Sequence, residues 1–272
     1  MSISNYNGSL QKNAPFNSID NRAFLYADAL FDTLVYKDNS PVFFEEHYFR
    51  LLASMRQLRM DIPDFFTQEY WQKEMAKTIA VNTLTNARVR TTVFRNASGL
   101  YTPSKHDVSI LIQVSDLKQV VKGNYSLGLY KDYLLNTSTL DNLKTTNRIH
   151  NVLAAIFAKE NEFDNCILIN HKKQVAETIN ANIFLVVGTE IKTPPLSSGC
   201  INGIVRQKVI DFLEKRADYQ IKEVEITPFE LKNADEVFLT NSVVGIQPVT
   251  QYKRKTYTAY VSEFLKQDIC GK

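Results

Sequence analysis

The order of local patterns along the chain predicts an α/β (α+β) fold in two domains. Segments rich in β-prone residues, such as 29–36 and 87–95, alternate with segments whose apolar residues recur at helical spacing, such as 45–60. A chain of 272 residues that is 44% hydrophobic can bury one large core or two of ordinary size. The polar segment 116–124 separates two such halves. Strands interleaved with helices are typical of the α/β and α+β classes.

The first half is expected to form a small N-terminal α/β domain over residues 1–115. In the helical segment 45–60, Phe49, Leu52 and Met55 recur at a spacing that places them on one face. Charged residues alternate with smaller or apolar ones in the segment 87–95, so it is expected to be a strand with its arginines on one face. The predicted elements of this half are strands at 29–36, 87–95 and 108–114 and helices at 45–60 and 71–80.

The second half, residues 125–272, is expected to form a larger α/β domain after the linker 116–124. Lys144 lies in a segment typical of a strand end or loop, and a helix is expected directly after it. The apolar residues expected on one face of that helix are Ile149, Val152, Leu153, Ile156 and Phe157. The predicted elements of this half are strands near 125–133, 166–170, 182–187 and 236–240 and helices near 148–161 and 203–215.

The composition excludes several classes of function. A net charge of +3 is small for this length and argues against nucleic acid as a partner. Cys166, Cys200 and Cys270 form neither an even disulfide framework nor zinc-like pairs, so we expect a reducing compartment and no metal site. The start lacks a basic segment followed by an apolar stretch, and no run approaches the roughly 18 apolar residues of a membrane helix. We expect a soluble cytoplasmic protein with no membrane partner.

Lys144 and Glu177 together point to a cofactor. Each is expected at the boundary of a secondary-structure element, within the segments 142–148 and 175–184. Pyridoxal 5′-phosphate needs a lysine for a Schiff base and an acidic partner that keeps its pyridine nitrogen protonated. The pair therefore predicts a pyridoxal phosphate site.

The chain resembles the class IV aminotransferases, which are fold-type IV pyridoxal phosphate enzymes with a D-amino acid aminotransferase-like fold. The family includes branched-chain aminotransferases, D-amino acid aminotransferases and aminodeoxychorismate lyases. The resemblance runs from about residue 20 to about residue 250 and rests on several motifs in the expected order. These motifs are NRAFLYADALFDT (21–33), EHYFRL (46–51), LKTTN (143–147), VAETINANIF (175–184), TPPL (193–196), GIVR (203–206) and FLTNS (238–242).

The resemblance implies roles around the cofactor. Lys144 would hold it and move the proton at the substrate α-carbon, because the pKa of a lysine falls readily in a desolvated, cation-rich site. Glu177 would pair with the pyridine nitrogen. Arg50 would bind the phosphate, for which a guanidinium fork is suited. His47, one helical turn earlier, is expected to be structural.

A second phosphate contact is expected at the start of the helix near 203–215. The amides of Gly203, Ile204 and Val205 would point into an anion site at the positive end of this helix. The family often has threonine where this chain has Val205, so a backbone contact survives but a hydroxyl contact does not. Hydroxyls and amides after the strand at 236–240 are placed to bind phosphate or substrate, or to close a turn. These residues are Thr240, Asn241 and Ser242.

Departures from the family pattern bear on the substrate. Arg90 matches a substrate-side arginine of branched-chain aminotransferases, and Phe31 and Arg95 are further substrate candidates. Arg148 and Asn241 look more like the lyase branch. D-amino acid aminotransferases trap the substrate carboxylate with an arginine whose place falls near Leu100, which counts against that branch. Many members also have glycines where this chain has Ala27 and Ala29, and the added methyl groups either narrow the substrate side or adjust packing.

Three functions remain open on the sequence. The first is an aminotransferase that moves an amino group between an amino acid, such as a branched-chain one, and a 2-keto acid through Lys144. The second is an aminodeoxychorismate lyase that forms 4-aminobenzoate and pyruvate. The third and most remote is a binding protein without cofactor on the same scaffold. The resemblance also implies a homodimer.

Overall fold

The computed structural model describes residues 2–12, 20–118 and 121–270, and the chain divides into two compact units. Unit 1 comprises Met1–Gln119 and Lys144–Asn147, and unit 2 comprises Val120–Leu143 and Arg148–Lys272. The expected domain limits stay a prediction, and residues 119–120 of the expected linker lie outside the described residues. The segment Lys144–Asn147 groups with unit 1, although both flanking segments belong to unit 2.

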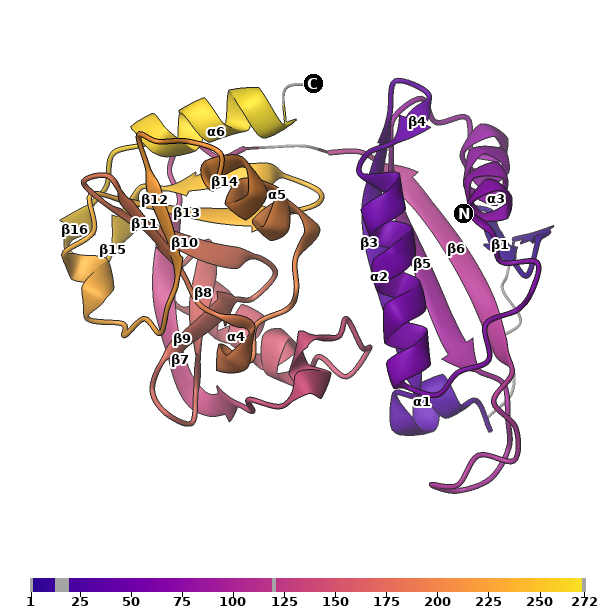
Figure 1. Cartoon of the computed structure of the whole chain (residues 1–272). Coiled ribbons are helices and arrows are strands. Elements are labelled where there is room, and N and C mark those ends of the chain that lie inside the picture. Colours follow the sequence, from indigo (N-terminus) through magenta and orange to yellow (C-terminus); the bar gives the residue numbers. More distant parts are fainter. Residues whose placement is uncertain (1, 13–19, 119–120, 271–272) are drawn as a thin grey trace. The chain divides into compact units, whose positions relative to one another are not determined.

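Unit 1 contains an antiparallel sheet of order β2-β1-β6-β5-β3-β4 (Figure 1). Asp32 on β3 lies opposite Thr91 on β5, so their side chains share one face of the sheet. His47 of α2 contacts Asp32, and Trp71 of α3 donates to the Thr91 hydroxyl, so both helices cover this face. The elements are β1 (Ser4–Tyr6), β2 (Ser9–Gln11), α1 (Arg22–Tyr26), β3 (Ala29–Lys37), β4 (Ser40–Pro41), α2 (Phe44–Gln57), α3 (Gln68–Val81), β5 (Ala87–Arg95) and β6 (Val108–Asp116).

Two predictions for unit 1 were wrong in detail. Phe49 was expected on the buried face of its helix, but its side chain is 52% exposed, and the buried face of α2 includes His47, Leu51 and Met55 instead. The predicted strand 87–95 is confirmed, yet its arginines do not share a face. Arg95 is an odd number of residues from Arg88 and Arg90, so it points to the opposite side.

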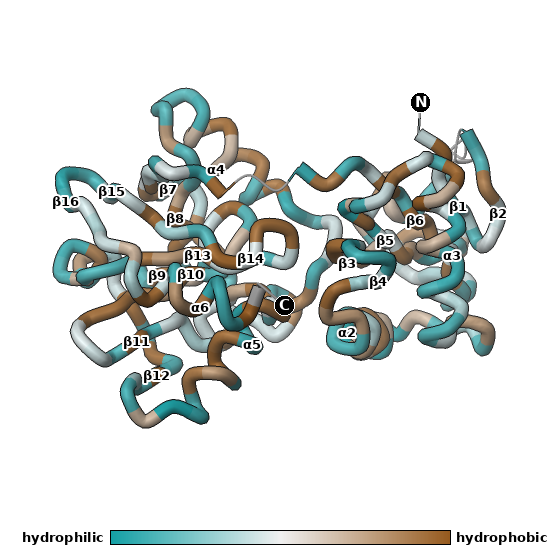
Figure 2. Tube along the Cα trace, turned by 90° about the horizontal axis from the view of Figure 1, so that it is seen from above, coloured by the Kyte–Doolittle hydropathy of each residue, from teal (hydrophilic) through white to brown (hydrophobic). Residues whose placement is uncertain are grey.

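Unit 2 contains two sheets, of order β12-β11-β10-β13-β14 and β16-β15-β7-β8-β9. One apolar core joins them, with Ile167 of β8, Ile183 of β10 and Val237 of β13 all fully buried. Hydrophobic colour follows these inner strands in Figure 2, whereas the turn near β16 is hydrophilic. The elements are β7 (Ser126–Leu135), η1 (Thr139–Asn142), α4 (Ile149–Glu160), β8 (Asn165–Asn170), β9 (Val175–Thr178), β10 (Asn182–Val187), β11 (Glu190–Thr193), η2 (Leu196–Ser198), α5 (Ile204–Leu213), β12 (Gln220–Glu223), η3 (Glu230–Lys232), β13 (Glu236–Asn241), β14 (Gly245–Val249), β15 (Gln251–Tyr252), β16 (Lys255–Thr256) and α6 (Tyr260–Cys270).

The helix after Lys144 is confirmed, but part of its apolar stripe faces outward. Ala154 and Ala158 are the residues of α4 that are buried against β7 and β8. Ile149, Val152 and Ile156 are about half exposed. Leu153 and Phe157 of the same face are partly buried and pack against this cluster. Helical periodicity therefore located the stripe, but only one edge of it contacts the sheet, beside the small alanines.

No helix in the described part of the chain is long and apolar enough to span a membrane. Over the same residues, no cluster of three or more histidine, cysteine or acidic side chains is arranged to hold a metal ion.

Candidate active site

Phe31 carries two cations above its ring in unit 1. The Arg90 guanidinium carbon lies 3.8 Å from the ring centroid, and Lys144 Nζ lies 4.8 Å from it. Arg90 faces Thr33 across the β3–β5 pair, so it shares the face of Phe31, opposite the face that α2 and α3 cover. Burial and the neighbouring Arg88 lower the pKa of Arg90. A desolvated guanidinium beside a lysine amine is suited to bind an anion that carries an amino group.

The backbone around Lys144 is fixed to β3. The Lys144 carbonyl accepts from Phe31 N at 2.9 Å, and Thr146 N donates to the Ala29 carbonyl at 3.0 Å. Thr145 forms an isolated β-bridge with Leu30 between these bonds. The segment therefore extends the edge of β3, and the lysine leaves it from a defined backbone position. The sequence had predicted a strand end or loop here, which the structure confirms.

Arg50 is held by a buried carboxylate. Its Nε and Nη2 donate to Asp32 Oδ2 at 3.0 and 2.7 Å, and His47 Nδ1 lies 2.6 Å from Asp32 Oδ1. Burial alone would raise the pKa of Asp32, but Arg50 and His47 outweigh this effect and hold that pKa far below its usual value. Asp32 is thus an anion that orients Arg50. A structural His47 was expected from the sequence, but Asp32 was missed, although it lies inside the first quoted motif.

Glu177 lies on β9 in unit 2 and is buried. Its Oε2 accepts from the backbone amide of Ile201 at 2.9 Å, which fixes one carboxylate oxygen. Arg148, at the start of α4, interacts electrostatically with the same carboxylate. Burial lowers the pKa of Arg148, while the negative charges of Glu177 and Asp141 raise it. Arg148 Nη2 donates to the Leu143 carbonyl. Among the predicted residues, unit 2 therefore brings Glu177 and Arg148 into one electrostatic environment.

Gly203, Asn182 and Thr240 lie together at the start of α5, and we call this group the α5 cradle. Gly203 is the N-cap of this helix, and a Cβ at this position would lie 2.0 Å from Asn182 Oδ1. Asn182 itself is fixed by donating to the Ile201 carbonyl at 2.8 Å, and it lies opposite Thr240 across the β10–β13 pair. Thr240 is 2% exposed, and its hydroxyl has no hydrogen-bond partner within the described residues. A buried hydroxyl without a partner is costly, and an anion at the positive end of α5 would satisfy it.

The residues around this cradle differ in which of their polar atoms are available to bind a ligand. Ile204 and Val205 are buried, so only their amides are available at the helix start. Asn241 Oδ1 accepts from the amides of Val243 and Val244 at 2.9 and 2.8 Å, so this oxygen closes the turn after β13. Ser242 lies in the same turn and is partly exposed. Asn182 was missed in the sequence, because its role arises only from its pairing with Thr240.

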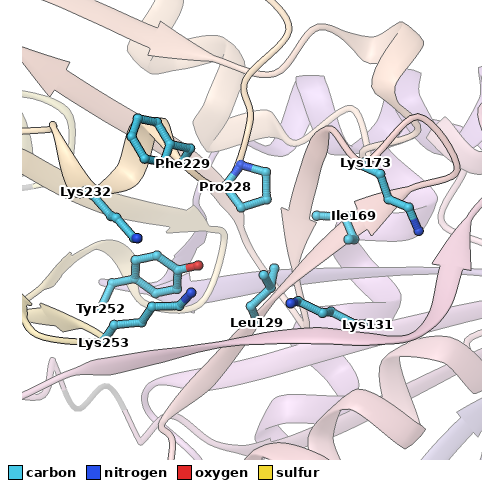
Figure 3. A pocket seen from close by; sticks show the side chains of 9 residues that line it. All are labelled: Leu129, Lys131, Ile169, Lys173, Pro228, Phe229, Lys232, Tyr252 and Lys253. Carbon is cyan, nitrogen blue, oxygen red and sulfur yellow. The ribbon is translucent and has the colours of Figure 1, made fainter.

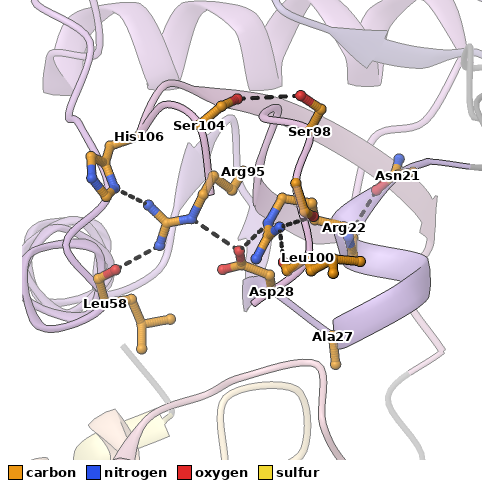
Figure 4. Close-up of polar contacts among 12 residues, drawn as sticks. Asn21, Arg22, Ala27, Asp28, Leu58, Arg95, Ser98, Leu100, Ser104 and His106 are labelled. Carbon is orange, nitrogen blue, oxygen red and sulfur yellow. Dashed lines mark hydrogen bonds and ion pairs between the residues drawn. The ribbon is translucent and has the colours of Figure 1, made fainter. Parts of the chain in front are cut away.

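Arg95 does not have the surroundings of a substrate residue, and this expectation is corrected. Its Nε donates to Asp28 at 2.9 Å, its Nη1 donates to the Arg59 carbonyl and contacts His106 Nδ1, and its Nη2 donates to the Leu58 carbonyl (Figure 4). Every guanidinium nitrogen is engaged, and the side chain is buried. The contacts make Arg95 a structural residue that ties β5 to the end of α2.

Asp28 completes this network. Arg22 Nε donates to the same Asp28 oxygen at 2.8 Å, and Arg22 Nη1 donates to the carbonyls of Gly99 and Leu100. Ala27, which precedes Asp28, ends α1 in the left-handed region with φ of 52°. A glycine would adopt this conformation at lower cost, because it has no Cβ. Ala29 is fully buried, so its methyl group adjusts packing.

Comparison with known proteins shows the family and the fold of this chain. A profile of the family described as amino-transferase class IV matches residues 29–252. An aminodeoxychorismate lyase of Vibrio harveyi is 28% identical over 251 residues, covering 90% of this chain and 89% of that protein. A D-alanine aminotransferase of Listeria monocytogenes is 24% identical over 276 residues, covering 93% and 92%. The solved structure of a branched-chain amino acid aminotransferase from Thermobaculum terrenum in its PLP form superposes with a TM-score of 0.83 at 18% identity, covering 99% of this chain and 94% of that one. The expected fold is thereby confirmed.

Proposed function

Since this chain belongs to the class IV aminotransferase family, we propose that it is a pyridoxal phosphate-dependent aminotransferase that transfers an amino group between an amino acid and a 2-keto acid. The observation that carries this proposal is the Phe31 ring with Lys144 Nζ at 4.8 Å and Arg90 at 3.8 Å. This arrangement places an amine that could transfer a proton next to a cation that could bind a carboxylate. An amino acid substrate requires both groups, one for its α-carbon proton and one for its carboxylate.

The residues present fit the cofactor. The α5 cradle, with the unpartnered Thr240 hydroxyl and the Gly203 backbone, would hold the phosphate, and Arg50 would add a charge oriented by Asp32. Glu177 would pair with the pyridine nitrogen. When bound, pyridoxal phosphate supplies an electron sink for the electrons left at the substrate α-carbon.

Lys144 would carry out the proton transfers. Its Nζ would take a proton from the substrate α-carbon and, in transamination, would hold that proton for return to the other side of the bound pair. The backbone bonds of Lys144 and Thr146 to β3 restrict where this amine can reach. Positioning of this kind accounts for a large part of enzymatic rate enhancement.

Substrate recognition is assigned to the other charged groups. Arg90 would bind the substrate carboxylate as a fork, with its guanidinium carbon 3.8 Å from the centroid of the Phe31 ring. Arg148 would meet a second polar group of the substrate, since its Nη2 is held by the Leu143 carbonyl. Arg95 is left out of this set because its nitrogens are engaged elsewhere.

A lyase activity is the second candidate. Arg148 and Asn241 match the lyase branch, and a lyase of Vibrio harveyi is similar over 90% of this chain. In this reaction Lys144 would remove a proton from aminodeoxychorismate, pyruvate would leave, and the ring would become aromatic as 4-aminobenzoate. The same residues serve both reactions up to the first proton transfer.

A substrate comparison separates the two activities. Purified enzyme is mixed with amino donors and 2-oxoglutarate, and separately with aminodeoxychorismate. Glutamate without 4-aminobenzoate supports the aminotransferase, and the reverse result supports the lyase and overturns the primary proposal.

The cofactor is tested by colour. The wild-type protein should show a visible absorption band that borohydride abolishes, and Lys144→Ala should lose this band. A colourless protein that pyridoxal phosphate does not reconstitute would contradict the cofactor assignment and would favour the cofactor-free binding protein.

A homodimer is also proposed. The outward stripe of α4, formed by Ile149, Val152 and Ile156, is an exposed apolar face on unit 2. A second copy of the chain is its expected occupant. Val152→Glu should convert the dimer to monomer in analytical ultracentrifugation, whereas Glu160→Gln at the exposed end of the same helix should not.

A reducing, cytoplasmic location is part of the same proposal. Cys166 and Cys200 are both free and buried. Burial raises the pKa of Cys166 to about 11 and that of Cys200 to about 12, so neither is a reactive thiolate at neutral pH.

A further inference from the structure

Unit 2 contains a cavity of about 440 Å³ that shares no residue with the cofactor and substrate candidates (Figure 3). Leu129 of β7 and Ile169 of β8 form part of its apolar wall. Pro228 and Phe229, just before η3, line it as well, and Tyr252 of β15 completes this group. A cavity of this size lies in the range of ordinary small-molecule sites.

Four lysines surround this cavity, and no acidic side chain lines it. All four are exposed, and none has an ion-pair partner among the residues that the structure describes. Elsewhere in unit 2 the lysines Lys192 and Lys222 are both paired, through Glu190. Uncompensated positive charge around an apolar cavity raises the local concentration of anions. The four lysines are Lys131, Lys173, Lys232 and Lys253.

Tyr252 adds an unsatisfied polar group to the wall. Its side chain is 1% exposed, and within the described residues its hydroxyl has no hydrogen-bond partner. In Figure 3 the hydroxyl points toward the space enclosed by the labelled side chains. A buried hydroxyl left unpaired costs free energy, so a ligand oxygen that accepts from it would recover that cost.

Phe229 indicates what the rest of the ligand is like. Its ring is 65% exposed, and Lys232 Nζ lies 5.5 Å from the ring centroid. Lys253 Nζ lies 5.5 Å from the Tyr252 ring in the same way. Each ring thus has a lysine ammonium next to it. The rings can pack against the aromatic body of a ligand while the ammonium groups bind its negatively charged substituent.

We propose that this cavity is a second ligand site, which binds an organic anion with an aromatic body and at least two negative charges. The body would pack on Leu129, Ile169 and Phe229, the charged group would meet the lysines, and one oxygen would accept from the Tyr252 hydroxyl. The site does not depend on the reaction that the enzyme catalyses.

The probe for this site is 1-naphthyl phosphate, titrated into the cofactor-loaded protein by calorimetry at low salt. We expect saturable binding that weakens with added salt, because the lysines are exposed to solvent. Neutral 1-naphthol and inorganic phosphate should each bind at least about tenfold more weakly than the probe. The first lacks the negatively charged group, and the second lacks the aromatic body. Inorganic phosphate that binds as tightly as the probe would contradict the aromatic part of the proposal.

Variants locate the binding. The double variant Lys131→Gln, Lys253→Gln should weaken the probe at least about tenfold. The matched control Lys73→Gln, Lys215→Gln removes two exposed lysines that do not line the cavity, and it should leave binding unchanged. Equal affinity in wild type and cavity variant would place the probe elsewhere and overturn the proposal, as would the absence of saturable binding.

Tyr252→Phe tests the hydroxyl separately. It keeps the ring and removes a group that has no partner in the described protein, so thermal stability should not fall. Probe affinity should fall by roughly threefold to tenfold, the equivalent of one hydrogen bond. Unchanged affinity in a stable Tyr252→Phe protein would remove the hydroxyl from the site.

Discussion

Asp32 holds the guanidinium of Arg50 through two nitrogens, with Nε and Nη2 at 3.0 and 2.7 Å from the same carboxylate oxygen. His47 contacts the other oxygen at 2.6 Å, so the carboxylate is fixed from both sides. A cation that is oriented before its ligand arrives loses little freedom on binding. The position of Arg50 is therefore set by the protein before any phosphate binds.

Asp32→Asn should lower the free energy of unfolding by about 3–5 kcal/mol at neutral pH, because it removes the buried charge partner of Arg50. Asp32 has a lowered pKa when folded, so its stabilisation is fully present above about pH 4. It is lost as the pH falls from there toward the folded pKa, and the difference between wild type and variant should shrink. Urea unfolding across this pH range measures it. Asp218→Asn, at an exposed pair with Arg216, is the control and should change little; equal effects of both variants would contradict the prediction.

Thr240→Val should separate ligand binding from stability. The Thr240 hydroxyl has no protein partner in the described residues, so the cofactor-free protein should be as stable as wild type or slightly more stable. Affinity for pyridoxal phosphate should fall about tenfold, because a hydrogen bond to a charged group is lost. Thr240→Ser keeps the hydroxyl and should retain most of the affinity. Loss of stability in Thr240→Val with unchanged cofactor affinity would assign the hydroxyl a structural role.

Gly203→Ala should weaken cofactor binding through geometry alone. The new Cβ would lie 2.0 Å from Asn182 Oδ1, and therefore the start of α5 or Asn182 must shift. Such overpacking costs about 1–3 kcal/mol, visible in cofactor titration and in thermal unfolding. Gly123→Ala is a matched control in the same unit, because a Cβ there would meet nothing within 4 Å. A Gly203→Ala protein that binds the cofactor like wild type would show that the cradle is not used.

Arg90→Lys should raise KM for the amino donor by about 10–100-fold, since the ammonium group cannot replace the guanidinium fork. The absorption band of the bound cofactor should remain, because Arg90 is not among the groups assigned to it. Arg88→Lys changes the next arginine on the same face of β5 and should leave KM unchanged. A fall in kcat with constant KM in Arg90→Lys would contradict a role in carboxylate binding.

Arg95→Met should act on stability and not on the substrate. It removes contacts with Asp28, His106 and two backbone carbonyls, and it should lower the free energy of unfolding by about 3–5 kcal/mol. Where the protein remains folded, KM for the donor should match wild type. A raised KM together with wild-type stability would return Arg95 to the substrate site.

The sequence predicted the positions of helices and strands better than the exposure of their side chains. The strand at 87–95 and the helix after Lys144 were both found, because β-propensity and helical period are properties of adjacent residues. The exposure of Phe49 on α2 and Ile156 on α4 was not found, since period alone does not tell which neighbour a face meets.

The candidate site divides in the same way. Lys144, Glu177 and Arg50 stand in motifs of recognisable spacing, so they were proposed from sequence. Asp32 and Asn182 gain their roles from partners that approach through the fold, namely Arg50 on α2 and Thr240 on the opposite strand. The contacts of Arg95 were not foreseen, because an arginine beside a suspected site looks the same in sequence whether its nitrogens are engaged or not.

The place of Lys144–Asn147 within unit 1 bears on how the protein is made. Thr146 donates to the carbonyl of Ala27, 119 residues earlier in the chain, so this contact closes a very long loop. During synthesis the N-terminal strands leave the ribosome well before residue 146, and a late segment must then find a sheet edge that already exists. The entropic cost of closing such a loop grows only slowly with length. The lysine that we propose as catalytic is therefore positioned by strands that are synthesised before it, and we expect damage to β3 to abolish activity without touching the lysine itself.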